Sequence, residues 1–244
     1  MRTHSVNEAG YRVLLVGATG LVGQALTQQL LADECCTELT VLVRRPLFQA
    51  GTGSRAKKLH VIVADLDEME QSLADVHVDL VFCTLGTTIK KAKSQEAFRK
   101  VDYEYPVRLA KWAKEHGVIK MIIVSAMGAK ASSSIFYSRV KGEMEEKLTS
   151  ISLEELHILR PSLLLGKRKE FRLGEKIAIW LSPLLRVVTI GPLRVYRPIK
   201  DKQVASGMRA AAFTKRLLGK DGPVRIYENS EIAEAAAAAA AVQT

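Results

Sequence analysis

Three glycines near the start of the chain constrain its fold more than any other feature. Residues 13–16 form an apolar run with the branched content of a buried parallel strand, and Gly17, Gly20 and Gly23 follow it at intervals of three. From residue 21 onward, apolar residues recur with the spacing of a helix. The sequence therefore predicts a strand, a tight turn and a helix in direct succession.

This turn predicts a phosphate-binding site at the start of the helix. The first N–H groups of a helix lack intrahelical partners, and its N-terminus carries a partial positive charge. We expect Gly17 to take the turn dihedrals, Gly20 to let the backbone approach a pyrophosphate, and Gly23 to let the helix lie close to the strand. The spacing differs from the common Gly-x-Gly-x-x-Gly, and a tight turn without a ligand is the alternative.

Strand-like and helix-like segments then alternate along the chain. Further strands are expected at residues 39–43, 59–64, 78–83, 118–124, 156–159 and 224–227. Helices are expected at residues 67–73, 94–116, 136–147, 201–218 and from 230 onward, with Gly117 as a C-cap. This order predicts an α/β fold, a doubly wound parallel sheet of Rossmann type, with ligands at the carboxyl ends of the strands.

We expect residues 1–244 to form a single domain. The chain has 244 residues, 48% of them hydrophobic, and no linker or repeat divides it. Residues 161–200 break the alternation and are expected to form a substrate-side insertion, with plain core and loop as the alternative, while residues 235–244 form a low-complexity tail. No apolar run reaches the roughly 18 residues of a membrane span.

Charge and cysteine content narrow the function classes. The net charge is +10, but the basic residues are scattered and aromatic residues make up only 6%, so a nucleic-acid surface is disfavoured against a solvated surface that serves an anionic cofactor. Cys35, Cys36 and Cys83 have neither metal-ligand spacing nor the number expected of a disulfide scaffold. We therefore expect no metal, and a cytoplasmic location.

The ends of the next strands suggest which dinucleotide binds. Arg44 and Arg45 follow the second strand, where an acidic residue would bind the ribose 2′-hydroxyl of NAD and an arginine suits the 2′-phosphate of NADP. We therefore expect NADP(H), with Arg44 as the first contact and Arg45 as the second; solvated arginines are the alternative. After the third strand, Asp65 can accept from the adenine amino group or cap the next helix. The small residues 84–88 suit a backbone that runs along the cofactor.

Tyr137 and Lys141 are the main candidates for chemistry. They lie four residues apart on a predicted helix and therefore share one face. A free tyrosine, with a pKa near ~10, is a poor base at neutral pH, but a nearby ammonium stabilises its phenolate. Such a tyrosine can give a proton to a carbonyl oxygen as hydride arrives, and Ser125 can polarise the same oxygen. A core tyrosine beside a surface lysine is the alternative.

These motifs together resemble the short-chain dehydrogenase/reductase superfamily. The resemblance covers roughly residues 11–227 and depends on Gly17-x-x-Gly20-x-x-Gly23, on Tyr137-x-x-x-Lys141 and on Arg160-Pro161. Residues 82–88, 137–143 and 159–175 are similar to the atypical branch of HIV Tat-interacting protein 30-like oxidoreductases. The chain departs from extended members at Asp102, where asparagine is frequent, and the short spacing after Ser125 leaves Ser132, Ser133 or Ser134 as alternative hydroxyls.

The resemblance implies an NADP(H)-binding fold with catalytic Ser125, Tyr137 and Lys141, and with Lys141 also bound to the nicotinamide ribose. The expected cofactor-binding residues are Gly17, Thr19, Gly20, Leu21, Val22, Gly23, Arg44, Arg45, Asp65, Leu66, Thr84, Leu85, Gly86, Ser125, Tyr137, Lys141, Arg160 and Pro161.

Two functions follow as hypotheses. The first is an NADP(H)-dependent oxidoreductase that acts on the carbonyl/alcohol pair of an unidentified small molecule. The second is a regulatory or redox-sensing protein that binds NADPH and a protein partner without significant turnover. A homodimer through residues 94–116 and 135–149 is a further expectation from the resemblance.

Overall fold

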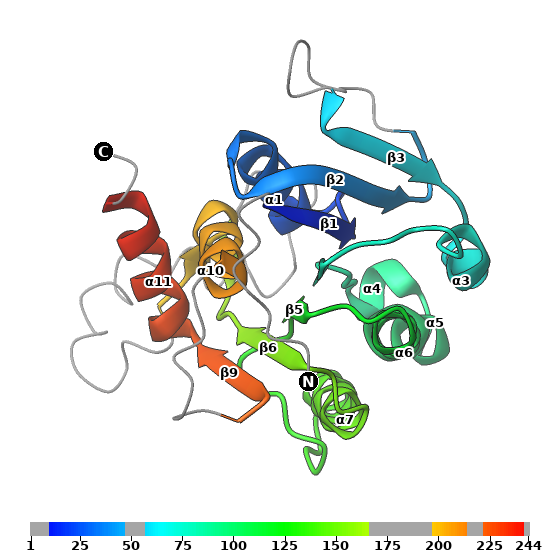
Figure 1. Ribbon diagram of the computed structural model, residues 1–244. Coiled ribbons are helices and arrows are strands. Elements are labelled where there is room, and N and C mark those ends of the chain that lie inside the picture. Colours follow the sequence, from blue (N-terminus) through cyan, green and yellow to red (C-terminus); the bar gives the residue numbers. More distant parts are fainter. Residues whose placement is uncertain (1–9, 47–56, 166–196, 214–221, 242–244) are drawn as a thin grey trace.

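Seven parallel strands form one sheet in the order β3-β2-β1-β4-β5-β6-β9 (Figure 1). The computed structural model describes residues 10–46, 57–165, 197–213 and 222–241. The strands are β1 (Tyr11–Val16), β2 (Cys36–Val43), β3 (Leu59–Val63), β4 (Leu80–Cys83), β5 (Lys120–Val124), β6 (Glu155–Arg160) and β9 (Val224–Glu228). The predicted doubly wound parallel sheet is thereby confirmed. The order reverses between β1 and β4, which is where such sheets bind ligands.

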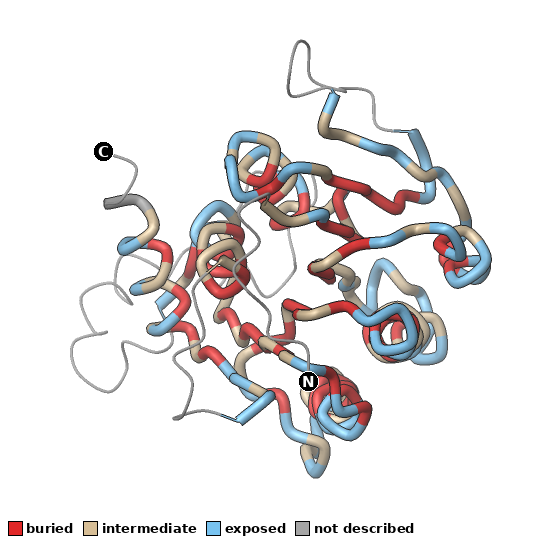
Figure 2. The backbone as a smooth tube through the Cα atoms, viewed as in Figure 1, coloured by how far each residue is buried: buried red, intermediate tan, exposed pale blue. Residues whose placement is uncertain are grey.

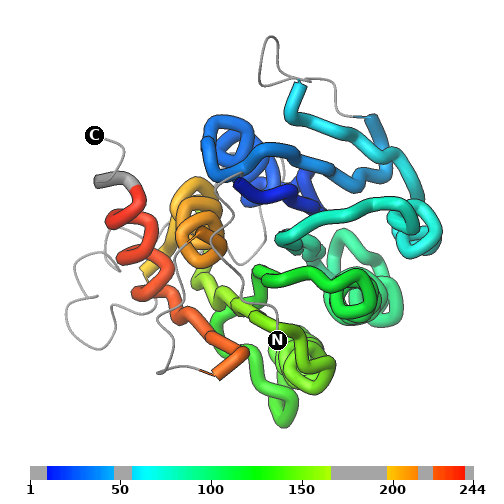
Figure 3. Tube along the Cα trace, viewed as in Figure 1, coloured from blue at the N-terminus to red at the C-terminus, as the bar shows by residue number. Residues whose placement is uncertain are grey.

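Helices cover both faces of this sheet. One layer contains α1 (Leu21–Ala32), α10 (Asp201–Phe213) and α11 (Asn229–Ala241), and the other contains α3 (Met69–Ser72), α6 (Tyr105–Glu115) and α7 (Phe136–Ser150) (Figure 1). Figure 3 shows α1 and α10 side by side although they lie far apart in the sequence. An ion pair of 2.6 Å between Arg209 and Asp33 joins them.

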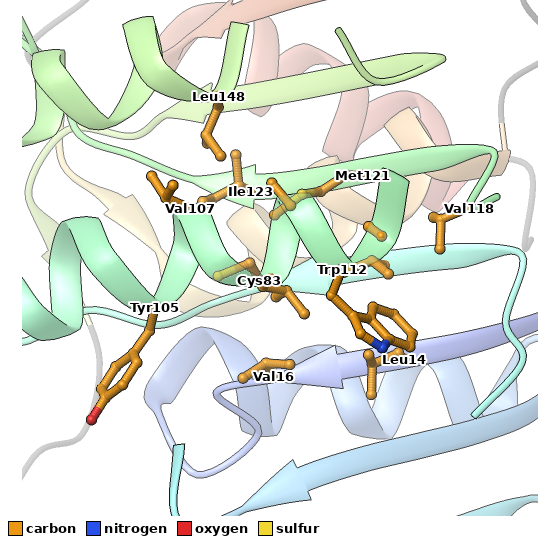
Figure 4. Packing of buried hydrophobic residues seen from close by; sticks show 14 of the residues in the cluster. Leu14, Val16, Cys83, Tyr105, Val107, Trp112, Val118, Met121, Ile123 and Leu148 are labelled. Atoms are coloured by element: carbon orange, nitrogen blue, oxygen red, sulfur yellow. The ribbon is translucent and has the colours of Figure 1, made fainter. Parts of the chain in front are cut away.

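The strands alternate their side chains between two apolar clusters. Leu14 and Val16 of β1 pack with α6 and α7, whereas Val13 and Leu15 pack with α1 and α10. Trp112 of α6, 2% exposed, lies in the first cluster (Figure 4). Figure 2 shows the buried residues running through the central strands. Burying one such large side chain contributes about 1.5–3 kcal/mol, so both layers fix the helices firmly on the sheet.

The long helix expected at residues 94–116 contains an irregularity that the sequence does not predict. It consists of α5 (Gln95–Arg99), a π-helical turn η2 (Lys100–Glu104) and α6. Gly117 ends it with a φ of 66°, which confirms the predicted C-cap. Two short helices lie at other strand ends, η1 (Leu66–Glu68) and α4 (Ile89–Ala92). Single π turns inside helices are frequent at functional sites.

Part of the expected substrate-side insertion is described. A small second sheet pairs β7 (Leu164–Leu165) with β8 (Ile199–Lys200) in parallel. The expectations for residues 166–196 and 214–218 lie outside the described residues, and the single-domain assignment stays a prediction. The alanine run belongs to α11, which reaches Ala241. Within the described ranges, none of the helices combines the length and apolar content needed to cross a membrane.

Candidate functional site

The glycine turn separates into two structural glycines and one that the fold does not need. Gly17 has a φ of +100°, and a Cβ there would lie 2.7 Å from the hydroxyl oxygen of Thr84 and 2.8 Å from the backbone N of Leu85. A Cβ on Gly23 would overlap the carbonyl oxygen of Gly17. A Cβ on Gly20 would meet its nearest neighbour at 3.5 Å, an ordinary contact. The missing side chain at Gly20 therefore clears space on the outer side of the turn.

The beginning of α1 fits an anionic group at this position. Gly20 is the N-cap residue, no side chain caps the helix, and the first turn contains no acidic residue. By helix geometry the N–H groups of Leu21, Val22 and Gly23 lack intrahelical partners, and Thr19 beside them is exposed. A clear approach, three free donors and a partial positive charge suit the pyrophosphate of a dinucleotide.

The expected ribose and adenine contacts are placed as follows. Leu42 of β2 pairs with Val16 of β1, so Arg44 follows beside the glycine turn. Arg44 and Arg45 are exposed, and within the described part of the chain neither makes an ion pair. Asp65 accepts from the backbone N of Asp67 at 2.9 Å, so of its two expected roles the cap is confirmed. The adenine contact and the 2′-phosphate contact stay predictions. The side chain of Leu66 is buried in the core.

Ser125 lies directly after β5 and presents a buried hydroxyl. The residue is 5% exposed, and its Oγ has no hydrogen-bond partner among the described residues. A buried hydroxyl without a partner costs about 1–3 kcal/mol, and a hydrogen bond to a bound ligand would remove this cost. Of the alternative serines, Ser133 accepts from the backbone N of Ile135 at 3.1 Å, and Ser132 and Ser134 are exposed. Ser125 is thus the buried hydroxyl of this set.

Lys141 is buried and paired with an acid that the sequence interpretation left without a role. Its Nζ lies 2.8 Å from Oδ1 of Asp102, and the two side chains are 4% and 1% exposed. Burial lowers the pKa of Lys141, but the carboxylate of Asp102 and the phenol of Tyr137 outweigh it, so the pKa lies above its usual value. The ammonium is therefore charged and near Tyr137, as expected, and a carboxylate also faces it.

The sequence interpretation assigned no role to Phe98 or to Asp102, and both lie against expected site residues. The ring of Tyr137 lies 5.6 Å from that of Phe98, and the backbone N of Thr87 donates to Oδ2 of Asp102 at 2.8 Å. A sequence signal for Asp102 existed: it lies four residues after Phe98 and seven before Leu109, on an otherwise apolar helix stripe. An acid at such a position requires a partner, because a buried unpaired charge is costly.

Arg160, expected to bind the cofactor, is engaged by two carboxylates. Its guanidinium lies 2.5 Å from Glu145 of α7 and 3.0 Å from Glu228 of β9. The hydrogen bonds that Arg160 donates to Glu145 raise the pKa of Arg160 above its usual value despite partial burial. The carbonyl of Pro161 accepts from the backbone N of Met127 at 3.0 Å. These contacts join α7, β6 and β9, and the cofactor role of both residues stays a prediction.

The structure brings the remaining expected residues into one continuous region. The glycine turn contacts Thr84 and Leu85, a Cβ on Gly86 would lie 3.5 Å from Asp102, and Asp102 pairs with Lys141. This path runs along the carboxyl ends of β1 and β4 to α7. A parallel α/β sheet with a glycine turn, a bare helix N-terminus and adjacent polar side chains defines a dinucleotide-binding protein.

Comparison with known proteins agrees with this class. The NAD(P)H-binding family matches residues 17–172, and the chain belongs to that family. It is 37% identical over 185 residues to protein FMP52 of Candida albicans. The aligned region covers 71% of this chain and 80% of that protein. It is 35% identical over 167 residues to protein HTATIP2 of Rattus norvegicus, 68% of each chain. The resemblance to the HIV Tat-interacting protein 30-like branch is thereby confirmed.

Solved structures share the fold. The ADP-L-glycero-D-manno-heptose-6-epimerase of Helicobacter pylori superimposes with a TM-score of 0.64 at 18% identity, covering 92% of this chain and 80% of its own. MoeE5 in complex with UDP-glucose and NAD gives 0.62 at 17% identity, covering 93% and 81%. At such identity the likeness concerns the fold alone.

The expected cytoplasmic location is wrong by the same comparison. The FMP52 relatives of Candida albicans, Eremothecium gossypii and Emericella nidulans are named mitochondrial. The expectation depended on cysteines that form no scaffold. Free thiols indicate a reducing environment, which does not distinguish one reducing compartment from another.

Proposed function

We propose that this protein is an NADP(H)-dependent oxidoreductase that interconverts the carbonyl and alcohol forms of a small molecule. The observation that carries the proposal is the juxtaposition of the buried Lys141, the half-buried Tyr137 and the bare N-terminus of α1 along one edge of the sheet. The exposed Arg44 and Arg45 beside the glycine turn support the phosphorylated cofactor over NAD.

Each residue then has a role that its surroundings support. NADPH, when bound, supplies the hydride that reaches the carbonyl carbon. Tyr137 donates its phenolic proton to the carbonyl oxygen, and the O–H bond of the alcohol forms there. Lys141 stabilises the phenolate that remains and binds the nicotinamide ribose. Ser125 donates a hydrogen bond to the same oxygen as negative charge develops.

A second function is supported by one observation. Asp102 offsets the positive charge of Lys141 at 2.8 Å, so less of that charge acts on Tyr137 than in an unpaired lysine. An NADPH-binding regulatory protein with little turnover would tolerate this arrangement. Since relatives are named mitochondrial, we also propose a mitochondrial location for either function.

The decisive experiment compares binding with turnover. Titration with NADPH and NADH, followed by fluorescence, should show tighter binding of NADPH. NADPH consumption is then measured against a panel of aldehydes and ketones. Tyr137→Phe should keep NADPH affinity and remove turnover, whereas Tyr11→Phe, far from the site, should change neither. Tight binding with no reduction of any panel member would favour the regulatory function, and unchanged turnover in Tyr137→Phe would remove Tyr137 from the chemistry.

A further inference from the structure

Two pairs of side chains match in register between neighbouring helices. Phe98 and Asp102 are four residues apart, as are Tyr137 and Lys141. The ring of Phe98 lies against that of Tyr137, at 5.6 Å, and the carboxylate of Asp102 lies against the ammonium of Lys141, at 2.8 Å. The segment that includes α5 and η2 therefore contacts both functional residues of α7, one helical turn apart.

Asp102 also contacts a second part of the site. Its Oδ2 accepts from the backbone N of Thr87 at 2.8 Å, and a Cβ on Gly86 would lie 3.5 Å from its Oδ1. Thr87 and Gly86 belong to the segment after β4, whose first residue, Thr84, packs against the glycine turn. One buried carboxylate thus links the cofactor-side segment to α7 through its two oxygens.

Stability alone does not account for this pair. Two charges that are 4% and 1% exposed have lost most of their hydration, and such a pair adds little stability compared with apolar residues of the same size. A buried ion pair instead fixes geometry, because it holds the two charged groups at one separation. Removing either partner leaves a costly unpaired charge. A geometric role fits its position between two parts of the site.

We propose, on the basis of the proposed function, that Asp102 is a positioning residue that fixes Lys141 relative to the segment at residues 84–87. It acts through Lys141 and Thr87 and does not itself contact the cofactor. Lys141 then meets the ribose, and residues 84–87 meet the cofactor beside it, at a separation that the carboxylate sets.

The charged and titratable groups that face Lys141 define the test. They are Asp102 from η2, Tyr137 from its own helix and Cys83 from β4. Burial raises the pKa of Cys83 to about 11, so below pH 9.5 its thiol stays protonated. In this range Asp102 supplies the negative charge that opposes the burial of Lys141.

The first measurement uses Asp102→Asn, which keeps the size and the acceptor for Thr87 but removes the charge. NADPH affinity should fall about tenfold or more, since small displacements of positioned groups have large effects. Without the carboxylate, burial lowers the pKa of Lys141 below that of the unfolded chain. The unfolded state then binds more protons, and the stability of the variant rises with pH. The stability gap to the unaltered protein should therefore narrow between pH 7 and 9.5.

A control and an opposite outcome make this result specific. Glu143 lies on α7, like Lys141, and forms an ion pair with Arg99 of α5, but the side chains of Arg99 and Glu143 are 40% and 30% exposed. Glu143→Gln removes this exposed pair and is therefore the control. It should leave NADPH affinity unchanged and give a small gap that is constant with pH. A gap for Asp102→Asn that is equally constant, together with unchanged NADPH affinity, would mean that Asp102 only fills space, and the proposal would be overturned.

The second measurement needs no cofactor and therefore separates this proposal from the proposed function. In Lys141→Met, hydrogen exchange at the Thr87 amide should accelerate by about tenfold or more, although Lys141 does not touch Thr87, because the carboxylate loses its second anchor. Unchanged exchange would overturn the positioning role even if the protein reduces carbonyl compounds. Accelerated exchange in a protein without turnover would support the positioning role of Asp102 and reject the proposed oxidoreductase function.

If Asp102→Asn does not fold, the double variant with Lys141→Met replaces it. Both groups are then uncharged, so adding Asp102→Asn to Lys141→Met removes an unpaired buried charge and should raise the stability above that of Lys141→Met alone. A double variant no more stable than Lys141→Met would show that the two residues are not coupled and would overturn the proposal.

Discussion

Thr84 donates its hydroxyl hydrogen to the carbonyl oxygen of Val16 at 3.3 Å, and its backbone N donates to the same oxygen at 2.8 Å. The end of β4 is thereby held against the end of β1, directly behind the glycine turn. The space behind Gly17 and Gly23 is filled by this contact, while the space in front of Gly20 is left clear. Protein packing therefore explains two of the three glycines, whereas packing does not require the third, and we propose that Gly20 serves ligand access.

The glycines should respond differently to the same substitution. Gly23→Ala places a methyl group onto the carbonyl of Gly17, and overpacking of this kind should reduce the free energy of unfolding by about 2 kcal/mol or more. Gly20→Ala meets only an ordinary contact and should cost about 1 kcal/mol or less, yet reduce NADPH affinity about tenfold or more. Urea unfolding measures the stability of each variant, and NADPH titration measures its cofactor affinity. Equal loss of stability in the two variants would contradict this division.

Arg44 and Arg45 should determine the choice between cofactors. Arg44→Ala should weaken NADPH binding by roughly tenfold to a hundredfold, the range expected for one charge-assisted hydrogen bond of about 1.5–3 kcal/mol, and leave NADH binding unchanged. Arg45→Ala should have a smaller effect in the same direction. Arg225→Ala, on the opposite edge strand β9, is the control for net charge. An equal loss for NADH and NADPH would remove the arginines from the 2′-phosphate.

Acid should destabilise the protein partly through His157. Burial lowers the pKa of His157, although its hydrogen bond to Glu155 opposes the effect. Above the ordinary value near ~6.5 the imidazole is neutral in both states; as the pH falls below it, the unfolded chain takes up the proton first and stability is lost. His157→Gln should flatten the decrease between pH 7 and 5.5 by at most about 1.4 kcal/mol per pH unit. Above pH 7, plots of the free energy of unfolding against pH should run parallel for the variant and the unaltered protein.

Arg160 should matter for stability more than an exposed arginine does. Arg160→Met leaves the buried Glu145 without its partner, and loss of one member of a buried pair costs about 3–5 kcal/mol at most. Arg12→Met breaks a similar pair with Asp79, but Arg12 is 47% exposed, and the loss should stay near 1 kcal/mol or below. Thermal unfolding compares them. NADPH affinity of the folded Arg160→Met protein then tests the expected cofactor contact separately.

The sheet could be predicted from the sequence because each strand carries its own signal. Residues 13–16, 39–43 and 118–124 are largely apolar runs bounded by turn residues, and parallel strands joined through a helix take the right-handed connection in nearly all proteins. The π turn at residues 100–104 could not be predicted, since it adds one residue to a helix without a change of apolar period.

The site was less predictable because its contacts are made between elements. Tyr137 and Lys141 share a helix, so their spacing is visible in the sequence. The pairing of Lys141 with Asp102, and of Arg160 with Glu145, depends on how helices and strands pack. A local pattern shows that a buried charge needs a partner, but only the packing shows which residue is that partner.

The unobstructed position of Gly20 in the turn has a practical consequence for work in cells. Exchanging one hydrogen atom of Gly20 for a methyl group should yield a folded protein that holds its coenzyme about tenfold or more weakly. In a strain that carries this single change, a phenotype that needs the bound coenzyme should weaken. A phenotype that needs only the protein surface should persist.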